Sequence, residues 1–151
     1  MNPATRFANG PADSPGFLLW RLTLRWQRAV TEALAPLGLT HVQFVLLACT
    51  WWLNTQGHQP NQVTIADQAA TDVKMTSEIL RKLESRGLVR RGTDTQDTRA
   101  KVVIVTEAGA VLARRAVMVM EQADAEFFAG ISGSFVDQMR ELAAFVPPER
   151  P

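Results

Sequence analysis

The spacing of apolar residues predicts two helices in the first third of the chain. Over Phe17–Leu37, apolar residues recur every three or four positions, which is the spacing of one stripe on an amphipathic α-helix. A turn at 36–38 ends this helix, and Thr40 with Gln43 has the form of a capping box that starts the next one. Because residues 44–53 are apolar almost all round, we expect this second helix at the centre of the domain.

Two shorter helices are expected in the middle of the chain. Val63 is compatible with a short strand, and Thr64 is placed to cap a third helix. Thr71–Asp72 form a turn into a fourth helix over 73–85, which Gly87 terminates. This helix has two different sides: Thr76, Ile79, Leu80 and Leu83 face inward, whereas Lys74, Ser77 and Arg81 face the opposite way.

A hairpin follows the fourth helix. Residues 88–91 and 101–105 read as strands, and the polar connection 92–99 is longer than a tight hairpin needs. Such a loop beside a basic helix has the form of a wing. A helix-turn-helix followed by a wing places one helix in the DNA major groove and a loop beside it.

Two further helices are expected at the C-terminal end. The first begins at Thr106 and reaches about Phe128, and a break at 130–133 separates it from the second. Ser134 is placed to cap that second helix, which reaches about Phe145. The first helix of the chain and these last two carry broad apolar faces that one chain of this size cannot cover, so we expect a homodimer.

Positive charge is concentrated on the helix-and-wing segment. Between positions 74 and 101, eight basic residues stand against four acidic ones, a net charge of +4, whereas the whole chain is +1 and the remainder is therefore −3. The basic residues are Lys74, Arg81, Lys82, Arg86, Arg90, Arg91, Arg99 and Lys101. A polyanion is the partner that such a distribution favours.

The composition favours one compact domain with helical extensions. The chain has 151 residues, of which 46% are hydrophobic. No apolar run approaches the roughly 18 residues of a membrane span, and the N-terminus lacks the apolar core of a secretory signal. The single cysteine, Cys49, cannot form an internal disulfide. We therefore expect a cytoplasmic protein without membrane contact.

The sequence offers no catalytic or metal-binding constellation. It has no glycine-rich phosphate loop, Ser/His/Asp arrangement or paired carboxylates, so we expect neither an enzyme nor a cofactor. His41, His58 and Cys49 lack metal-ligand spacing. Cys49 lies within an apolar helix, where a thiol is usually inert, although a redox-sensing role is the alternative.

These segments, in this order, resemble the multiple-antibiotic-resistance regulator (MarR) family of winged-helix transcription factors over about residues 17–146. The resemblance rests on Gly38-Leu39-Thr40, Leu83-Glu84-Ser85-Arg86-Gly87-Leu88-Val89, Asp97-Thr98-Arg99 and Val105-Thr106-Glu107-Ala108-Gly109. It implies a dimer that binds pseudo-palindromic operators and is often released by small aromatic or phenolic ligands, or by oxidation. The chain departs from many relatives at Thr98, where they carry Arg, and at Glu78, where they carry a basic or amide residue.

The expected fold is accordingly mostly α (α+β), a winged helix-turn-helix whose N- and C-terminal helices form a dimerisation region. Residues 1–16 are expected to be a flexible tail and 147–151 a second tail. Residues 17–38 and 106–146 would form the helical dimerisation region. Residues 39–105 would form the DNA-binding lobe.

The residues expected to contact double-stranded DNA lie on the fourth helix and the hairpin. They are Lys74, Met75, Ser77, Glu78, Arg81, Arg86, Arg91, Arg99 and Lys101. Two alternatives stay open: Met75 either touches a thymine methyl group or packs, and Arg86, Arg90 and Arg91 either contact phosphates or are ordinary surface charges. The resemblance implies that Arg99 is the wing arginine that enters the minor groove.

A small-molecule site is expected between the dimerisation helices and the DNA-binding lobe. Its residues would be Trp20, Arg21, His41 and Trp51, with core or dimer packing as the alternative for the tryptophans. The function that the sequence favours is a sequence-specific, ligand-responsive transcriptional repressor. The alternative is a winged-helix module used for protein–protein contact, which the net charge of +4 disfavours.

Overall fold

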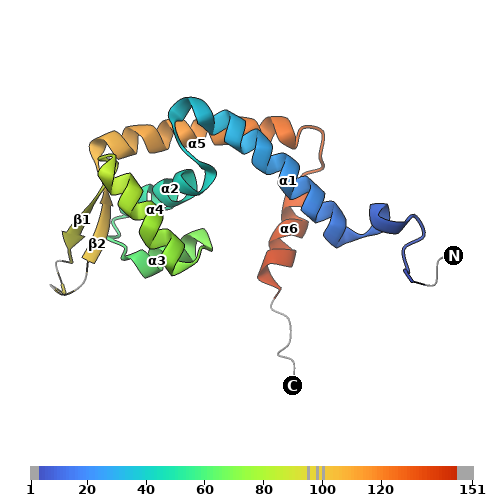
Figure 1. The fold of residues 1–151 in the computed structure, drawn as a ribbon, viewed down its shortest axis with the longest axis horizontal. Helices are drawn as coiled ribbons and strands as arrows, with labels where there is room; N and C mark the ends of the chain where they lie inside the picture. Colours follow the sequence, from blue (N-terminus) through green and yellow to red (C-terminus); the bar gives the residue numbers. More distant parts are fainter. Residues whose placement is uncertain (1–3, 95, 98, 100, 146–151) are drawn as a thin grey trace, which may run out of the picture.

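The computed structural model describes residues 4–94, 96–97, 99 and 101–145, and confirms the mostly α winged-helix fold (Figure 1). In chain order the elements are η1 Gly10–Asp13, α1 Pro15–Leu34, η2 Ala35–Leu37, α2 His41–Thr55, α3 Gln62–Ala69, α4 Val73–Ser85, β1 Val89–Thr93, β2 Lys101–Val105, α5 Glu107–Phe127 and α6 Ser134–Ala144. Thr98, residue 146 and the tail 147–151 lie outside the described residues.

α2 lies at the centre of the lobe, as expected. It packs against α3, α4, α5 and β2, and buries Leu46, Leu47 and Thr50. The expected capping box is confirmed: the Gln43 amide donates to Thr40 Oγ1 at 3.2 Å, and the Thr40 amide donates to Gln43 Oε1 at 3.1 Å. The start of this buried helix is therefore fixed by its own side chains.

The expected start of the third helix was wrong. α3 begins at Gln62, and its N-cap is Asn61, whose Oδ1 accepts from the Thr64 amide at 2.9 Å and from Thr64 Oγ1 at 3.1 Å. Val63 is an exposed residue of this helix and forms no strand. An asparagine side chain caps a helix as well as a threonine does, and Asn61, the earlier of the two suitable residues, is the N-cap.

The two strands form one antiparallel sheet that pairs Val89 with Val105 and Thr93 with Lys101. β1 begins one residue after the expected start and ends at Thr93. α5 packs closely on the turn before β1, because a Cβ at Gly109 would come within 1.9 Å of the Leu88 carbonyl oxygen. Position 109 therefore accepts only glycine without rearrangement.

α1, α5 and α6 extend away from the lobe (Figure 1). α1, which begins two residues earlier than expected, packs along α5, while α6 projects from the far end of α5. The expected cap of α6 was wrong: Gly133 holds the N-cap position, and the Ser134 amide donates to Ser132 Oγ at 3.3 Å. These three helices present the most exposed apolar side chains.

None of the helices within the described residues is by itself long and apolar enough to cross a membrane. In the same part of the chain, the pair Pro15–Leu37 and His41–Thr55, bent by 73°, reaches that length and composition together.

Candidate nucleic-acid interface

The outward side of α4 is polar and basic, as expected from its sequence. Asp72 caps the helix by accepting from the Met75 amide at 2.8 Å. The inward side, Thr76, Ile79, Leu80 and Leu83, is buried in the lobe. The outward side exposes Lys74, Met75, Glu78, Arg81 and Lys82, with Ser77 half-buried, and Val73 and Ser85 are exposed at the two ends of the helix. The core thus fixes which residues α4 offers to a partner.

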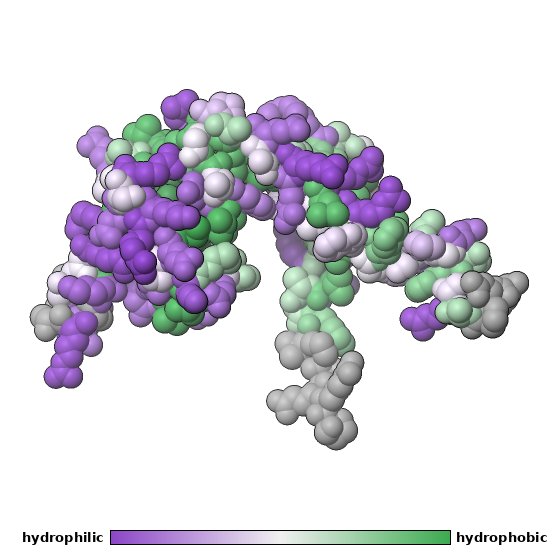
Figure 2. Space-filling view, viewed as in Figure 1, coloured by the Kyte–Doolittle hydropathy of each residue, from purple (hydrophilic) through white to green (hydrophobic). Residues whose placement is uncertain are grey.

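The charged groups on this side are three cations, Lys74, Arg81 and Lys82, and one acid, Glu78. Arg81 Nη2 donates to Ser77 Oγ at 3.4 Å, one turn away, so its guanidinium lies along the helix. Met75, at 39% exposure, is available for an apolar contact with a partner. Figure 2 shows hydrophilic side chains gathered over the part of the lobe where α4 and the hairpin lie.

The wing projects beside α4 (Figure 1). Two aspartates shape its tip: Asp94 Oδ1 accepts from the Gln96 amide at 2.8 Å, and Asp97 Oδ1 accepts from the Arg99 amide at 3.0 Å. Such local bonds fold a loop without any packed core. Arg99 and Lys101 are exposed at this end of the hairpin.

Two of the residues expected to contact DNA, Arg91 and Arg86, have partners on other elements of the fold. Arg91 Nε lies 3.3 Å from Glu84 Oε2, which joins β1 to the last turn of α4. Arg86 Nη1 donates to the Gly38 carbonyl at 2.8 Å and to Gln43 Oε1 at 3.4 Å. Neither interaction was anticipated from the sequence, because each joins segments that only the fold brings together.

A hollow of about 650 Å³ lies between α1, the start of α2 and the α3–α4 turn. Its lining is Gln27, Thr31, Thr40, His41, Val42, Val45, Ala69, Ala70 and Thr71. Burial lowers the pKa of His41 below its ordinary value, and the negative charge of Asp124 opposes this only in part. At neutral pH the imidazole at this wall is therefore uncharged and can both donate and accept a hydrogen bond.

Three side chains join the helices above this hollow. Trp26 Nε1 of α1 donates to Asp124 Oδ1 of α5 at 2.7 Å, and the Trp26 ring meets the His41 ring edge-on with centroids 5.1 Å apart. The sequence placed Trp26 on an apolar stripe but did not identify Asp124 as its partner. The signal that the sequence offered for this bond was the position of Asp124, which directly follows the expected apolar stripe of α5.

The four expected effector residues do not line one described hollow. His41 lines the one of about 650 Å³, while Trp20 is 61% exposed on α1 and Trp51 packs half-buried against the core. The Arg21 guanidinium lies 5.9 Å from the centre of the Phe17 ring on the same helix. A separate apolar hollow of about 340 Å³ lies between α1, α5 and α6, lined by Leu19, Leu22, Thr23, Trp26, Asp124, Phe127, Phe128, Phe135 and Met139.

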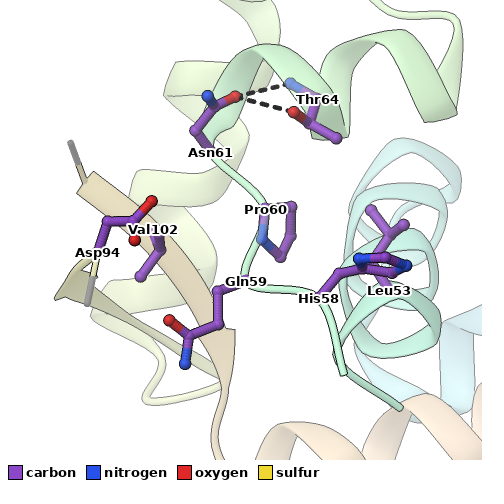
Figure 3. A pocket seen from close by; sticks show the side chains of 8 residues that line it. All are labelled: Leu53, His58, Gln59, Pro60, Asn61, Thr64, Asp94 and Val102. Atoms are coloured by element: carbon purple, nitrogen blue, oxygen red, sulfur yellow. Dashed lines mark hydrogen bonds between the residues drawn. The ribbon is translucent and has the colours of Figure 1, made fainter. Parts of the chain in front are cut away.

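A further hollow of about 340 Å³ lies between the α2–α3 loop and the β1–β2 hairpin (Figure 3). Asn61 and Thr64 face it from one side and Asp94 from the other, but the Asn61 oxygen already caps α3. The buried Pro60 carbonyl accepts from the Val103 amide at 2.9 Å, which fastens the loop to β2. These bonds indicate that the loop supports the wing.

Burial raises the pKa of the half-buried Cys49 thiol, which makes it less reactive, in line with the expectation of an inert residue. Among the residues that the structure describes, no three His, Cys, Asp or Glu side chains group closely enough to hold a metal ion.

Comparison with known proteins finds the same architecture. The family model described as "ArnR1-like, winged-helix domain" matches residues 37–122. The chain is 39% identical over 136 residues to the uncharacterized HTH-type transcriptional regulator YdcH of Bacillus subtilis, covering 89% of this chain and 92% of that protein.

Two solved structures are also similar over nearly their whole length. CouR from Rhodococcus jostii RHA1, bound to p-coumaroyl-CoA, is 31% identical with a TM-score of 0.81, covering 93% of this chain and 100% of that one. A MarR-family transcriptional regulator from Rhodococcus sp. RHA1 is 30% identical with a TM-score of 0.75, covering 92% and 94%.

Proposed function

Because the chain belongs to the MarR family of winged helix-turn-helix transcriptional regulators, which are not enzymes, we propose that it represses transcription by binding a specific DNA operator as a homodimer. The observation that carries this proposal is the outward side of α4. Lys74, Arg81 and Lys82 are exposed there, next to a wing that carries Arg99 and Lys101, on a chain whose net charge is only +1.

In this proposal the two copies of α4 enter successive major grooves, and the two wings reach the flanking minor grooves. The lobe 39–105 reads DNA, while 17–38 and 106–146 hold the dimer together, and the segments outside these ranges are the two tails. Two-fold symmetry then requires a pseudo-palindromic operator with half-sites one turn apart, about 34–36 Å. A regulator of this kind works where the DNA is, so we place it in the cytoplasm.

Selection from a random duplex pool tests the proposal. We expect enrichment of a pseudo-palindrome whose half-sites are about one helical turn apart. Glu78→Gln on the outward side of α4 should change the preferred bases, because base contacts specify whereas phosphate contacts position. Glu141→Gln, an equivalent change on α6, is the matched control and should select the same sequence. If the wild type enriches no duplex, the module serves protein contact instead.

We further propose that a small aromatic or phenolic effector releases the operator. The hollow of about 650 Å³ supports this, because it lies between the dimerisation helices and the lobe and has a neutral His41 at its wall. The relative CouR is bound to p-coumaroyl-CoA, an aromatic thioester. Trp20, Arg21 and Trp51 remain part of the predicted site, although they lie outside this hollow's lining.

Titration with p-coumarate and related aromatic acids tests the effector. Binding should quench tryptophan fluorescence, since the Trp26 ring meets His41 at this wall, and should weaken operator binding over the same concentration range. Trp20→Phe or Arg21→Ala should blunt the response and leave ligand-free DNA binding nearly intact. Absence of both quenching and release across the series would mean that the tryptophans serve packing alone.

A further inference from the structure

Arg86 connects the C-terminal end of the DNA-reading helix α4 to the α1–α2 turn and the start of α2. It is the C-cap residue of α4, and the chain turns away at Gly87, where φ is +71°. Its side chain extends to the turn between α1 and α2 and donates from Nη1 to the Gly38 carbonyl at 2.8 Å. The two residues are 48 positions apart in sequence, so this bond is a tertiary link.

The same guanidinium reaches the capping box of α2. Arg86 Nη1 lies 3.4 Å from Gln43 Oε1, the atom that also accepts from the Thr40 amide at 3.1 Å. One side-chain amide oxygen therefore accepts hydrogen bonds both from the N-cap residue of α2 and from the C-cap residue of α4. A displacement of the capping box must shift or break the bond to Arg86.

The hollow of about 650 Å³ is linked to α4 at two places. Thr40 lines it, and the Thr40 amide donates to Gln43 Oε1, the acceptor that it shares with Arg86. Thr71 lines it just before the N-cap Asp72, and its Oγ1 lies 2.8 Å from Thr76 Oγ1 within α4. An occupant of the hollow would thus meet Thr71, which is hydrogen-bonded directly to α4, and Thr40, which is linked to Arg86 through Gln43.

We propose that Arg86 is a positioning residue, which fixes α4 on the capping box of α2 so that the wall of the hollow and the DNA-reading helix move together. This inference rests on the proposed DNA-binding function. It replaces the expectation that Arg86 contacts phosphate, because a guanidinium held by Gly38 and Gln43 points toward the α1–α2 turn. The bond does not depend on an identified effector.

Operator binding as a function of salt separates the two roles. A phosphate contact at Arg86 in both protomers would make the slope of log affinity against log salt shallower by about 1.8 in Arg86→Gln. A positioning residue should leave the slope unchanged while affinity falls about tenfold, or roughly 1.4 kcal/mol for the two protomers together. Gln43→Ala should weaken binding similarly, and the double variant should lose no more than Arg86→Gln alone. Arg140→Gln on α6, outside the proposed DNA surface, is the matched control for removing an exposed arginine and should change neither the slope nor the affinity.

Amide hydrogen exchange tests the link to the hollow without an effector. Because coupling between two sites is reciprocal, saturating operator DNA should slow exchange over residues 38–45 in the wild type and in Arg140→Gln, but not in Arg86→Gln. In the DNA-free protein, Arg86→Gln should speed exchange over the same residues. A shallower salt slope, additive losses with Gln43→Ala, or unchanged protection in Arg86→Gln would each overturn the inference. If the wild type binds no duplex, the proposed function fails, and the DNA-free comparison still decides whether the link exists.

Discussion

Arg99 and Arg86 are both exposed arginines close to the DNA-reading helix, yet their surroundings give them different roles. The Arg86 side chain has two acceptors, the Gly38 carbonyl in the α1–α2 turn and Gln43 Oε1 in the first turn of α2. Arg99 lies at the wing tip, where the bond from its backbone amide to Asp97 shapes the loop and leaves its side chain exposed. A residue in this position can be changed with little effect on the rest of the fold.

Arg99→Ala should therefore weaken operator binding and leave both the fold and the dimer unchanged. If the guanidinium enters the minor groove, removing it from both protomers should also make the salt slope shallower, by about 1.8. Fluorescence anisotropy at several salt concentrations measures the change, with a thermal melt to confirm folding. Arg140→Ala, on α6 and paired with Asp137 at 2.7 Å, is the control. Unchanged operator affinity in Arg99→Ala would mean that Arg99 of the wing does not contact the DNA.

At the residue scale, the sequence predicted what is encoded locally. The Thr40–Gln43 box and the buried side of α4 follow from short spacings, and both are confirmed. The start of α3 was missed because Asn61 and Thr64 are both good caps, and their mutual bond decides between them only once the helix forms. The Arg86 link was not predictable, because it depends on how α1 and α2 are packed against α4.

At the scale of elements, the junction of α1, α2 and α5 joins the lobe to the extended helices. The 2.7 Å bond from Trp26 Nε1 to Asp124 Oδ1 fixes α1 on α5, and the edge-on contact with His41 extends the junction to α2. Periodicity predicted that these helices would pack, but a polar bond inside an apolar stripe has no periodic signature. The helices could therefore be predicted from periodicity, but the Trp26–Asp124 bond that orients α1 on α5 could not.

Trp26→Phe should destabilise the protein by about 1–2 kcal/mol, since it leaves the partly buried Asp124 oxygen without its donor. Urea denaturation followed by circular dichroism measures the free energy of unfolding. Trp52→Phe is the matched control: its side chain is 55% exposed, so the change should stay within about 0.5 kcal/mol. If both variants lost the same free energy of unfolding, the smaller ring, and not the missing bond to Asp124, would account for the destabilisation.

At the scale of the whole molecule, exposed apolar side chains concentrate on two helices. α1 exposes Phe17, Leu18, Leu19, Trp20 and Leu22, and α6 exposes Val136, Met139 and Leu142. One chain leaves these faces uncovered, and a second copy is the partner that the proposed two-fold mechanism requires.

Leu142→Glu should convert the dimer to a monomer, or weaken it strongly, because a carboxylate would be buried in an apolar interface. Light scattering across micromolar concentrations measures the mass. Met118→Glu is the matched control: Met118 is 70% exposed and Leu142 69%, but Met118 lies on α5 among Arg114, Arg115 and Glu121. A wild type that is already monomeric, or a dimer that tolerates Leu142→Glu, would contradict the assignment of this face.

The salt dependence of operator binding tests the central claim most directly. If two copies of the basic side of α4 and of the wing contact the DNA backbone, about 6–10 phosphates are neutralised. Log affinity should then fall linearly with log salt, with a loss of about 10³–10⁵ in affinity between about 50 and 200 mM. A nearly flat dependence would contradict DNA recognition by this surface.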